Sequence, residues 1–94
     1  MSITRINLFT ASDGNEDALF EFLQTLIPYI SASEGNLAVE VLRQCEESGK
    51  IVVLEKWRSV EDHKASVAGF PQDKMMSVMP LILEVPTGAY YQAE

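Results

Sequence analysis

Apolar and polar residues alternate along three segments of the chain, and this pattern predicts β-strands. Residues 3–11 and 37–44 alternate with the period of two that is typical of a strand. Residues 51–57 begin with an unbroken apolar run, which is typical of a strand buried on both faces. Because Gly49 ends a polar turn between the second and third segments, we expect these two strands to form an antiparallel hairpin.

A different spacing, of three and four residues, predicts an amphipathic helix between the first two strands. Proline removes a backbone donor, so we expect the helix to be kinked or distorted at Pro28 and to stop at Gly35. Either Asp13 or Asn15 can cap its beginning. The apolar face of this helix consists of Leu19, Phe22, Leu23, Leu26, Ile27 and Ile30.

The second half of the chain predicts a further helix and a last strand. Ser59 can cap a helix that ends at Gly69, and residues 72–79 can add one or two helical turns. A last strand is expected over residues 81–85 and 89–92, with an interruption at the Pro-Thr-Gly sequence between them. The side chains expected to face the core from the helical turns are Met75, Met76 and Met79.

The order strand, helix, strand, strand, helix, strand predicts an α+β fold of the ferredoxin-like βαββαβ type, with a four-stranded antiparallel sheet and helices on one face. Residues 1–94 are long enough for a single domain. The first and third strands are apolar on both faces, so an uncovered sheet face would expose a larger apolar patch than monomers normally tolerate. We therefore expect a homodimer that packs sheet against sheet.

Charge and composition exclude several classes of partner. The formal net charge is -7 and the seven Lys and Arg residues are scattered, so we expect neither nucleic acid nor an anionic membrane as a partner. The sole cysteine, Cys45, can form neither an internal disulfide nor a multi-thiolate metal site, and we interpret it as a spare thiol. The chain has no signal-peptide pattern and no apolar segment near the roughly 20 residues that span a bilayer, so a cytoplasmic protein is expected.

The segment from Trp57 to His63 joins the third strand to the second helix and carries the sole tryptophan and the sole histidine. Histidine titrates near neutrality, so an imidazole beside a large apolar ring can act as a general base without a metal. His63 falls three residues after Val60 and four before Val67, on the helix face expected to turn inward. The alternatives are a structural histidine and a plain core tryptophan.

Other residues could complete a pocket. Glu40 and Glu55 lie on predicted strands, and a carboxylate in an apolar sheet could be a base with a raised pKa. The favoured interpretation is an ion pair with a basic residue on a strand, namely Arg5, Arg43 or Lys56. Tyr90 and Tyr91 are expected at the dimer contact. Core residues that could also line an aromatic-sized pocket are Phe22, Leu26, Tyr29, Phe70, Met75 and Met79.

Several short motifs resemble the antibiotic biosynthesis monooxygenase domain family. The likeness covers nearly the whole chain and implies a dimeric α+β barrel, with an apolar pocket between the sheet and the helices of each protomer. It also implies a role for Asn7, which matches a strand-one asparagine that hydrogen-bonds substrate or oxygen in some members. The motifs are Glu34-Gly35-Asn36-Leu37, Leu54-Glu55-Lys56-Trp57, the run from Ser59 to Ser66, and Met79-Pro80-Leu81-Ile82.

The resemblance implies three alternative functions. The first is a cofactor-independent monooxygenase that oxidises a small quinol or polycyclic phenol with dioxygen, with His63 as base, Asn7 as hydrogen-bond donor and Trp57 as a wall. The second is a non-catalytic ligand-binding or regulatory dimer. The third is haem binding or degradation, which is weakened because haem-degrading members carry an axial histidine about ten residues beyond the tryptophan, near Val67 here.

Overall fold

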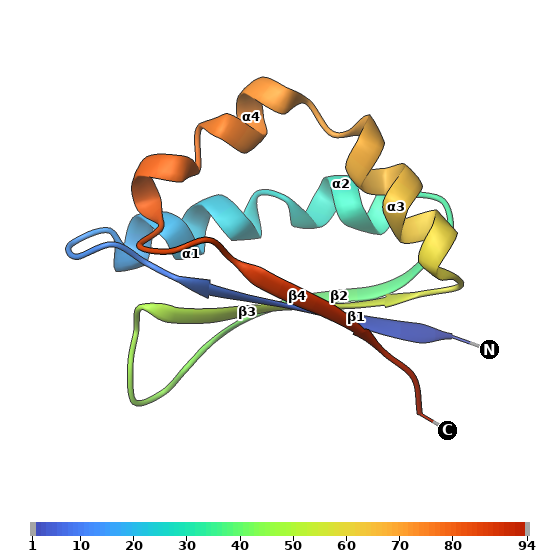
Figure 1. Cartoon of the computed structure of the whole chain (residues 1–94), viewed down its shortest axis with the longest axis horizontal. Helices are drawn as coiled ribbons and strands as arrows, with labels where there is room; N and C mark the ends of the chain where they lie inside the picture. Colours follow the sequence, from blue (N-terminus) through green and yellow to red (C-terminus); the bar gives the residue numbers. More distant parts are fainter. Residues whose placement is uncertain (1, 94) are drawn as a thin grey trace.

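The computed structural model describes residues 2–93 and confirms the predicted ferredoxin-like α+β fold, a four-stranded antiparallel sheet with its helices on one face (Figure 1). The spatial order of the strands is β2-β3-β1-β4, so the two strands predicted to be apolar on both faces are the central ones. The strands are β1 (Ile3–Thr10), β2 (Asn36–Arg43), β3 (Lys50–Trp57) and β4 (Thr87–Tyr91).

The register between β1 and β3 gathers polar side chains on the inner face of the sheet, which the helices cover. Arg5 lies opposite Glu55 and Asn7 lies opposite Val53. Since successive side chains on a strand point to opposite faces, this register places Arg5, Asn7, Glu55 and Trp57 on one face. The polar residues of the candidate site therefore come from adjacent positions of two paired strands.

The helix between the first two strands is interrupted at the predicted place. Pro28 lies in the first turn of the second helical segment. Backbone N–H groups in a first turn have no intrahelical acceptor, so the N–H that proline lacks costs no hydrogen bond. Ser59 caps α3 as predicted, because its side chain accepts a hydrogen bond from the Asp62 backbone at 3.1 Å. The helices are α1 (Glu16–Gln24), α2 (Ile27–Ala32), α3 (Val60–Gly69) and α4 (Gln72–Met76), followed by the short 3₁₀ helix η1 (Met79–Leu81).

The prediction of a strand over residues 81–85 is wrong. Within this segment only Ile82 forms a bridge, to Ala11, and β4 begins at Thr87. Leu81 still belongs to η1, and the segment meets the end of β1 through two backbone hydrogen bonds, from Ser12 to Leu81 and from Leu83 to Thr10. Pro86, which has no backbone donor, follows before β4 begins. The apolar side chain of Val85 is 81% exposed.

The hydrophobic core lies between α1 and the inner face of β3. Its centre consists of Leu19 and Leu23 from α1 packed with Ile51 and Val53 from β3. The prediction that three methionines face this core is wrong, because α4 stands away from the sheet (Figure 1) and the methionines of α4 and η1 are exposed, up to 67% for Met76. The methionines concerned are Met75, Met76 and Met79.

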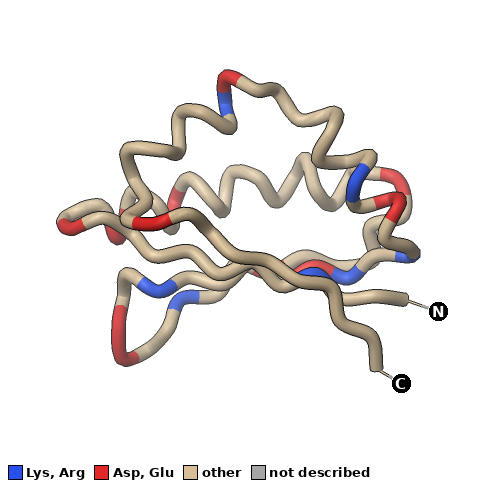
Figure 2. Tube along the Cα trace, viewed as in Figure 1, with Lys and Arg blue, Asp and Glu red and all other residues tan. Residues whose placement is uncertain are grey.

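The outer face of the sheet carries no helix in the region that the structure describes (Figure 1). Leu8, Leu42 and Tyr91 are exposed. This agrees with the apolar character expected of both faces, and the homodimer stays a prediction. Lys and Arg residues are distributed over several separate elements (Figure 2). No helix within residues 2–93 is long and apolar enough to cross a bilayer.

Candidate ligand-binding site

A cavity of about 440 Å³ lies between the inner face of the sheet and the helices. Its volume falls within the range of about 300–1,000 Å³ that is usual for small-molecule sites. Its walls come from β1, β3 and all four α-helices. The structure brings together here every site residue proposed from the sequence, namely Asn7, Phe22, Leu26, Trp57, His63, Phe70, Met75 and Met79.

A second hollow, of about 610 Å³, lies around the end of the β2–β3 hairpin and the segment before β4. Among its charged residues, Glu47, Lys50 and Glu84 are exposed, whereas Arg43 is half-buried. Neither of the buried titratable residues lines it. The first cavity is therefore the better candidate for chemistry, although the second hollow is larger.

At one end of the smaller cavity, Asn7 is held by a neighbour on its own strand. The Nε of Arg5 donates a hydrogen bond to Oδ1 of Asn7 at 3.1 Å. Because the oxygen of the amide is engaged in this way, the amide nitrogen is the group left to donate to a ligand. Asn7 is half-buried and lines the cavity, which fits a hydrogen-bond donor for a bound molecule.

His63 lies at the same end and is only 7% exposed. It sits in the first turns of α3, which Ser59 caps, and its imidazole faces the sheet. Its Nδ1 lies 2.7 Å from the hydroxyl oxygen of Tyr90, and its Nε2 lies 3.7 Å from Oε1 of Glu55. The second distance is too long for a direct hydrogen bond. The imidazole also packs edge-to-face against Trp57, with ring centroids 5.5 Å apart.

Burial shifts the pKa values of both titratable groups at this end. Burial, with the charge of Arg5 as a smaller cause, lowers the pKa of His63 to about 4, so the imidazole is neutral near pH 7. Burial raises the pKa of the Glu55 carboxyl, while a hydrogen bond from Trp57 and the charge of Arg5 act in the opposite direction. The Nε1 of Trp57 donates that bond to Oε1 of Glu55 at 2.8 Å. A neutral imidazole therefore lies beside a buried carboxyl group.

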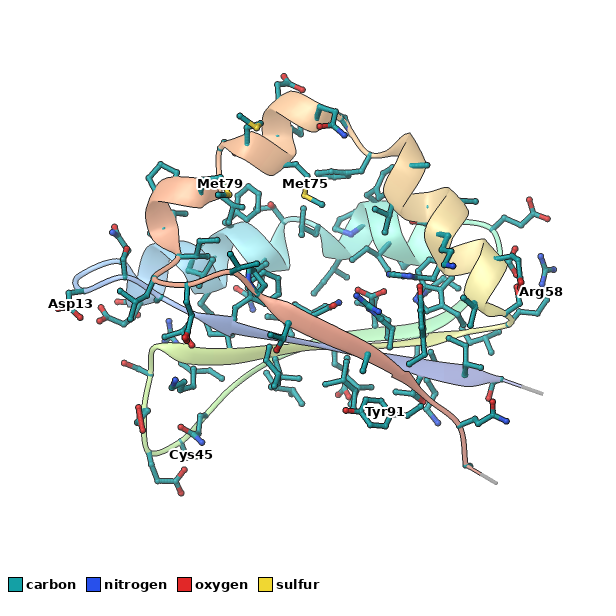
Figure 3. The ribbon with its side chains drawn as sticks, viewed as in Figure 1. Asp13, Cys45, Arg58, Met75, Met79 and Tyr91 are labelled. Carbon is teal, nitrogen blue, oxygen red and sulfur yellow. The ribbon has the colours of Figure 1, made fainter. Side chains whose placement is uncertain are left out.

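The rest of the cavity is largely apolar. Phe22 and Leu26 line it from α1 and the turn that follows, while Phe70 comes from the end of α3. Phe70 packs edge-to-face on Tyr29, whose hydroxyl donates to the backbone oxygen of Ser66 at 2.7 Å. In Figure 3 the sulfur atoms of Met75 and Met79 lie on the side of their segment that faces the sheet.

Two expectations about polar residues are corrected by this geometry. Tyr90 is not on the outer face with Tyr91, because the two alternate along β4 and Tyr90 points inward to His63. Glu55 forms no ion pair with a basic strand residue within residues 2–93, and its closest polar partner is Trp57. Arg43 instead pairs with Asp17 at 3.0 Å. The period of two in the last strand was the signal that could have separated the two tyrosines.

The structure also bears on metal binding and on the thiol. Among residues 2–93, no three His, Cys, Asp or Glu side chains lie close enough together to hold a metal ion. Cys45 is exposed and forms no disulfide within residues 2–93.

The fold is a small ferredoxin-like α+β domain with a cavity between the sheet and the helices. Residues 2–70 match the antibiotic biosynthesis monooxygenase family. The chain belongs to this family. No curated protein sequence matches the chain significantly.

Solved structures of low sequence identity share the fold. SnoaB, a cofactor-independent oxygenase from Streptomyces nogalater, superposes with a TM-score of 0.81 at 16% identity, covering 99% of this chain and 93% of SnoaB. Rv0793 from Mycobacterium tuberculosis has a TM-score of 0.86 at 18% identity, covering 100% and 96% of the two chains. For SO0527 from Shewanella oneidensis the TM-score is 0.85 at 24% identity, with 96% and 88% covered.

Proposed function

We propose that this protein is a cofactor-independent monooxygenase that oxidises a small quinol or polycyclic phenol with dioxygen. The observation that carries the proposal is that Asn7, Trp57 and His63 line one largely apolar cavity of about 440 Å³. Family membership and the shared fold with SnoaB agree with it. Since several chemistries can occupy one fold, the proposal rests on these residues more than on the fold.

The chemistry begins with removal of a proton from the substrate. If Nδ1 of His63 carries the imidazole proton and donates it to the hydroxyl oxygen of Tyr90, then Nε2 has a lone pair that can accept the substrate's proton. The amide nitrogen of Asn7 would donate to the oxygen that becomes negative. Trp57 and the apolar walls would exclude water and hold the aromatic ring.

The electron-rich anion would then reduce dioxygen directly. A ring carbon of a quinol forms a bond to one oxygen atom, the O–O bond breaks, and the second oxygen leaves as water. Quinol and dioxygen in equal amounts thus give a hydroxyquinone and water. The substrate supplies all the electrons, so the reaction needs no external reductant.

Oxygen uptake on a panel of quinols and polycyclic phenols tests this proposal. We expect the wild-type protein to consume oxygen faster than the uncatalysed reaction, and His63→Ala to be slower by roughly 10²–10⁴-fold, the usual contribution of a general base. Lys64→Ala, which changes the exposed neighbour of His63 on the same helix, should match the wild type. If the wild type shows no uptake above the uncatalysed rate, the proposal fails for those substrates.

The alternative functions have less support. A purely ligand-binding dimer predicts that His63 points away from the cavity and that His63→Ala leaves ligand affinity unchanged, whereas His63 is one of the lining residues. Val67 also lines the cavity, at about the position where haem-degrading members carry a histidine ligand, and an aliphatic side chain cannot ligate iron. A Soret band on addition of hemin would nevertheless favour the haem alternative.

A further inference from the structure

Arg5 is the permanently charged basic residue among those that line the cavity. Its Nε bonds to Asn7, but no hydrogen bond from its two terminal nitrogens is found within residues 2–93. In the same part of the chain it forms no ion pair with a carboxylate, even though Glu55 is its neighbour across β1 and β3. A guanidinium group has five N–H donors, so most of those of Arg5 remain available to a ligand.

Two residues of β4 shape the surroundings of this guanidinium. It stacks on the ring of Tyr90, with its central carbon 4.6 Å from the ring centroid. Gly88 lies directly opposite Asn7, and a β-carbon at Gly88 would overlap the side chains of both Asn7 and Arg5. The absent side chain at Gly88 therefore leaves the space that the Arg5 and Asn7 pair occupies.

The charge of Arg5 acts on the rest of the site. It lowers the pKa of His63 and also acts to lower the pKa of Glu55. A cation in a largely apolar cavity favours the charged form of a nearby acidic group, because water screens the interaction less there than in solution. A bound hydroxyl group that is already acidic should respond in the same way.

We propose that the cavity binds acidic aromatic hydroxyl compounds as their anions, with the phenolate oxygen held between the guanidinium of Arg5 and the amide nitrogen of Asn7. This inference rests on the proposed function and deepens it, since it names the ionised form of the substrate as the species bound. Arg5 would lower the free energy of the anion before oxygen reacts. Neutral His63 can accept the released proton and pass it on to solvent, because its lowered pKa of about 4 does not let the imidazole keep a proton near pH 7.

A coloured phenol tests the ionisation state of the ligand without any turnover. The probe is 4-nitrophenol, whose anion absorbs visible light and whose neutral form does not. We expect its pKa to fall by at least about 1 unit when it is bound to the wild-type protein, which is a tenfold preference for the anion. The methyl ether 4-nitroanisole cannot ionise, so any change in its binding with pH reports the other titratable groups that face Arg5. These groups are Glu55, His63 and Tyr90.

Variants of Arg5 assign the effect to this residue. In Arg5→Gln the pKa of bound 4-nitrophenol should rise to its value in water or above it, because burial alone disfavours the anion, and affinity for the anion should fall about tenfold or more. Arg5→Lys keeps the charge and should retain part of the effect, which keeps the test informative if the glutamine variant does not fold. Lys56→Gln is the matched control, because it removes one charge from the exposed side of β3.

The outcomes separate this inference from the proposed function. A bound probe that stays neutral, a probe that does not bind, or a folded Arg5→Gln variant that behaves like the wild type would overturn the role of Arg5. Binding of the anion without oxygen uptake on any quinol would leave the role of Arg5 intact and remove the monooxygenase proposal. Oxygen uptake together with binding of the neutral probe would leave the monooxygenase proposal intact and overturn the role of Arg5.

Discussion

The two ends of the cavity are built in opposite ways. At the polar end, Trp57 is 0% exposed and Glu55 is 5% exposed, and a hydrogen bond joins them. At the methionine end, Met75, Met76 and Met79 are exposed on a short helix and the turn after it (Figure 3). Proton transfer requires atoms held at fixed distances, whereas contact with a ring requires only a surface that can adapt.

The difference follows from what supports each end. The polar residues lie on β1, β3 and α3, and hydrogen bonds to neighbouring strands fix both strands along their length. The methionines lie between Pro71 and Leu81, and α4 has only five residues. Such a short helix gains little stability from its own hydrogen bonds. We therefore expect the protein to recognise the reacting group strictly and the rest of the substrate loosely.

Trp57→Ala should produce the largest loss of stability. Removal of a fully buried aromatic side chain usually lowers the free energy of unfolding by about 3–5 kcal/mol. Met76→Ala, at the other end of the cavity, should change it by no more than about 0.5 kcal/mol, as is usual for an exposed side chain. Urea unfolding followed by circular dichroism measures both values. Equal losses in the two variants would show that the ends do not differ in rigidity.

The second prediction concerns pH. The pKa of His63 is lowered to about 4 in the folded protein, so the folded state takes up its proton less readily than the unfolded chain, whose pKa is about 6.5. This stabilisation is fully present above about pH 6.5 and is lost as the pH falls toward about 4. We expect a loss of roughly 1–3 kcal/mol from this residue in that range.

Comparison with His63→Gln isolates the histidine contribution. The variant cannot titrate at this position, so its unfolding free energy should fall less between about pH 7 and about pH 4. Glu55 acts in the opposite direction, because its raised pKa stabilises the folded state at low pH and this contribution is lost as the pH rises through the raised pKa. Identical pH profiles for wild type and His63→Gln would contradict the burial of a neutral imidazole.

The sequence was sufficient to predict most of the fold and several of the residues that line the cavity. Alternation predicted β1 and β2, an apolar run predicted β3, and the Ser59 cap predicted the start of α3, since these features depend on residues close together in the chain. Because Asn7, Trp57 and His63 lie on elements that pack together in this fold, their convergence followed from the topology.

The contacts of Tyr90 could not be predicted in the same way. Its position beside His63 depends on the pairing of β4 with β1, which places Tyr90 opposite Arg5 across more than eighty residues of sequence. The strand predicted between η1 and β4 is absent, because residues 81–85 have the composition of a strand while Leu81 ends a 3₁₀ helix and Ile82 forms a single bridge. Long-range strand pairing was the missing information.

The smallest effect is expected from Tyr90→Phe, which removes one hydroxyl group from the polar end. The lost hydrogen bond to Nδ1 of His63 should lower the free energy of unfolding by about 1 kcal/mol. Tyr91→Phe is the matched control, since Tyr91 is exposed on the other face of the sheet and should have almost no effect. Nitrogen chemical shifts of His63, which is the sole histidine, report its tautomer without ambiguity.

The tautomer separates a catalytic role of Tyr90 from a merely structural one. In the wild type we expect the proton on Nδ1, with the hydroxyl oxygen of Tyr90 as its acceptor. Without that acceptor, the tautomer with the proton on Nε2 should gain population, because the carboxylate of Glu55 lies nearest to Nε2. This tautomer cannot accept the substrate's proton at Nε2, so oxygen uptake should fall while stability changes little. An unchanged tautomer with unchanged uptake would mean that the polar end is held by burial alone, and its contrast with the methionine end would then be one of packing only.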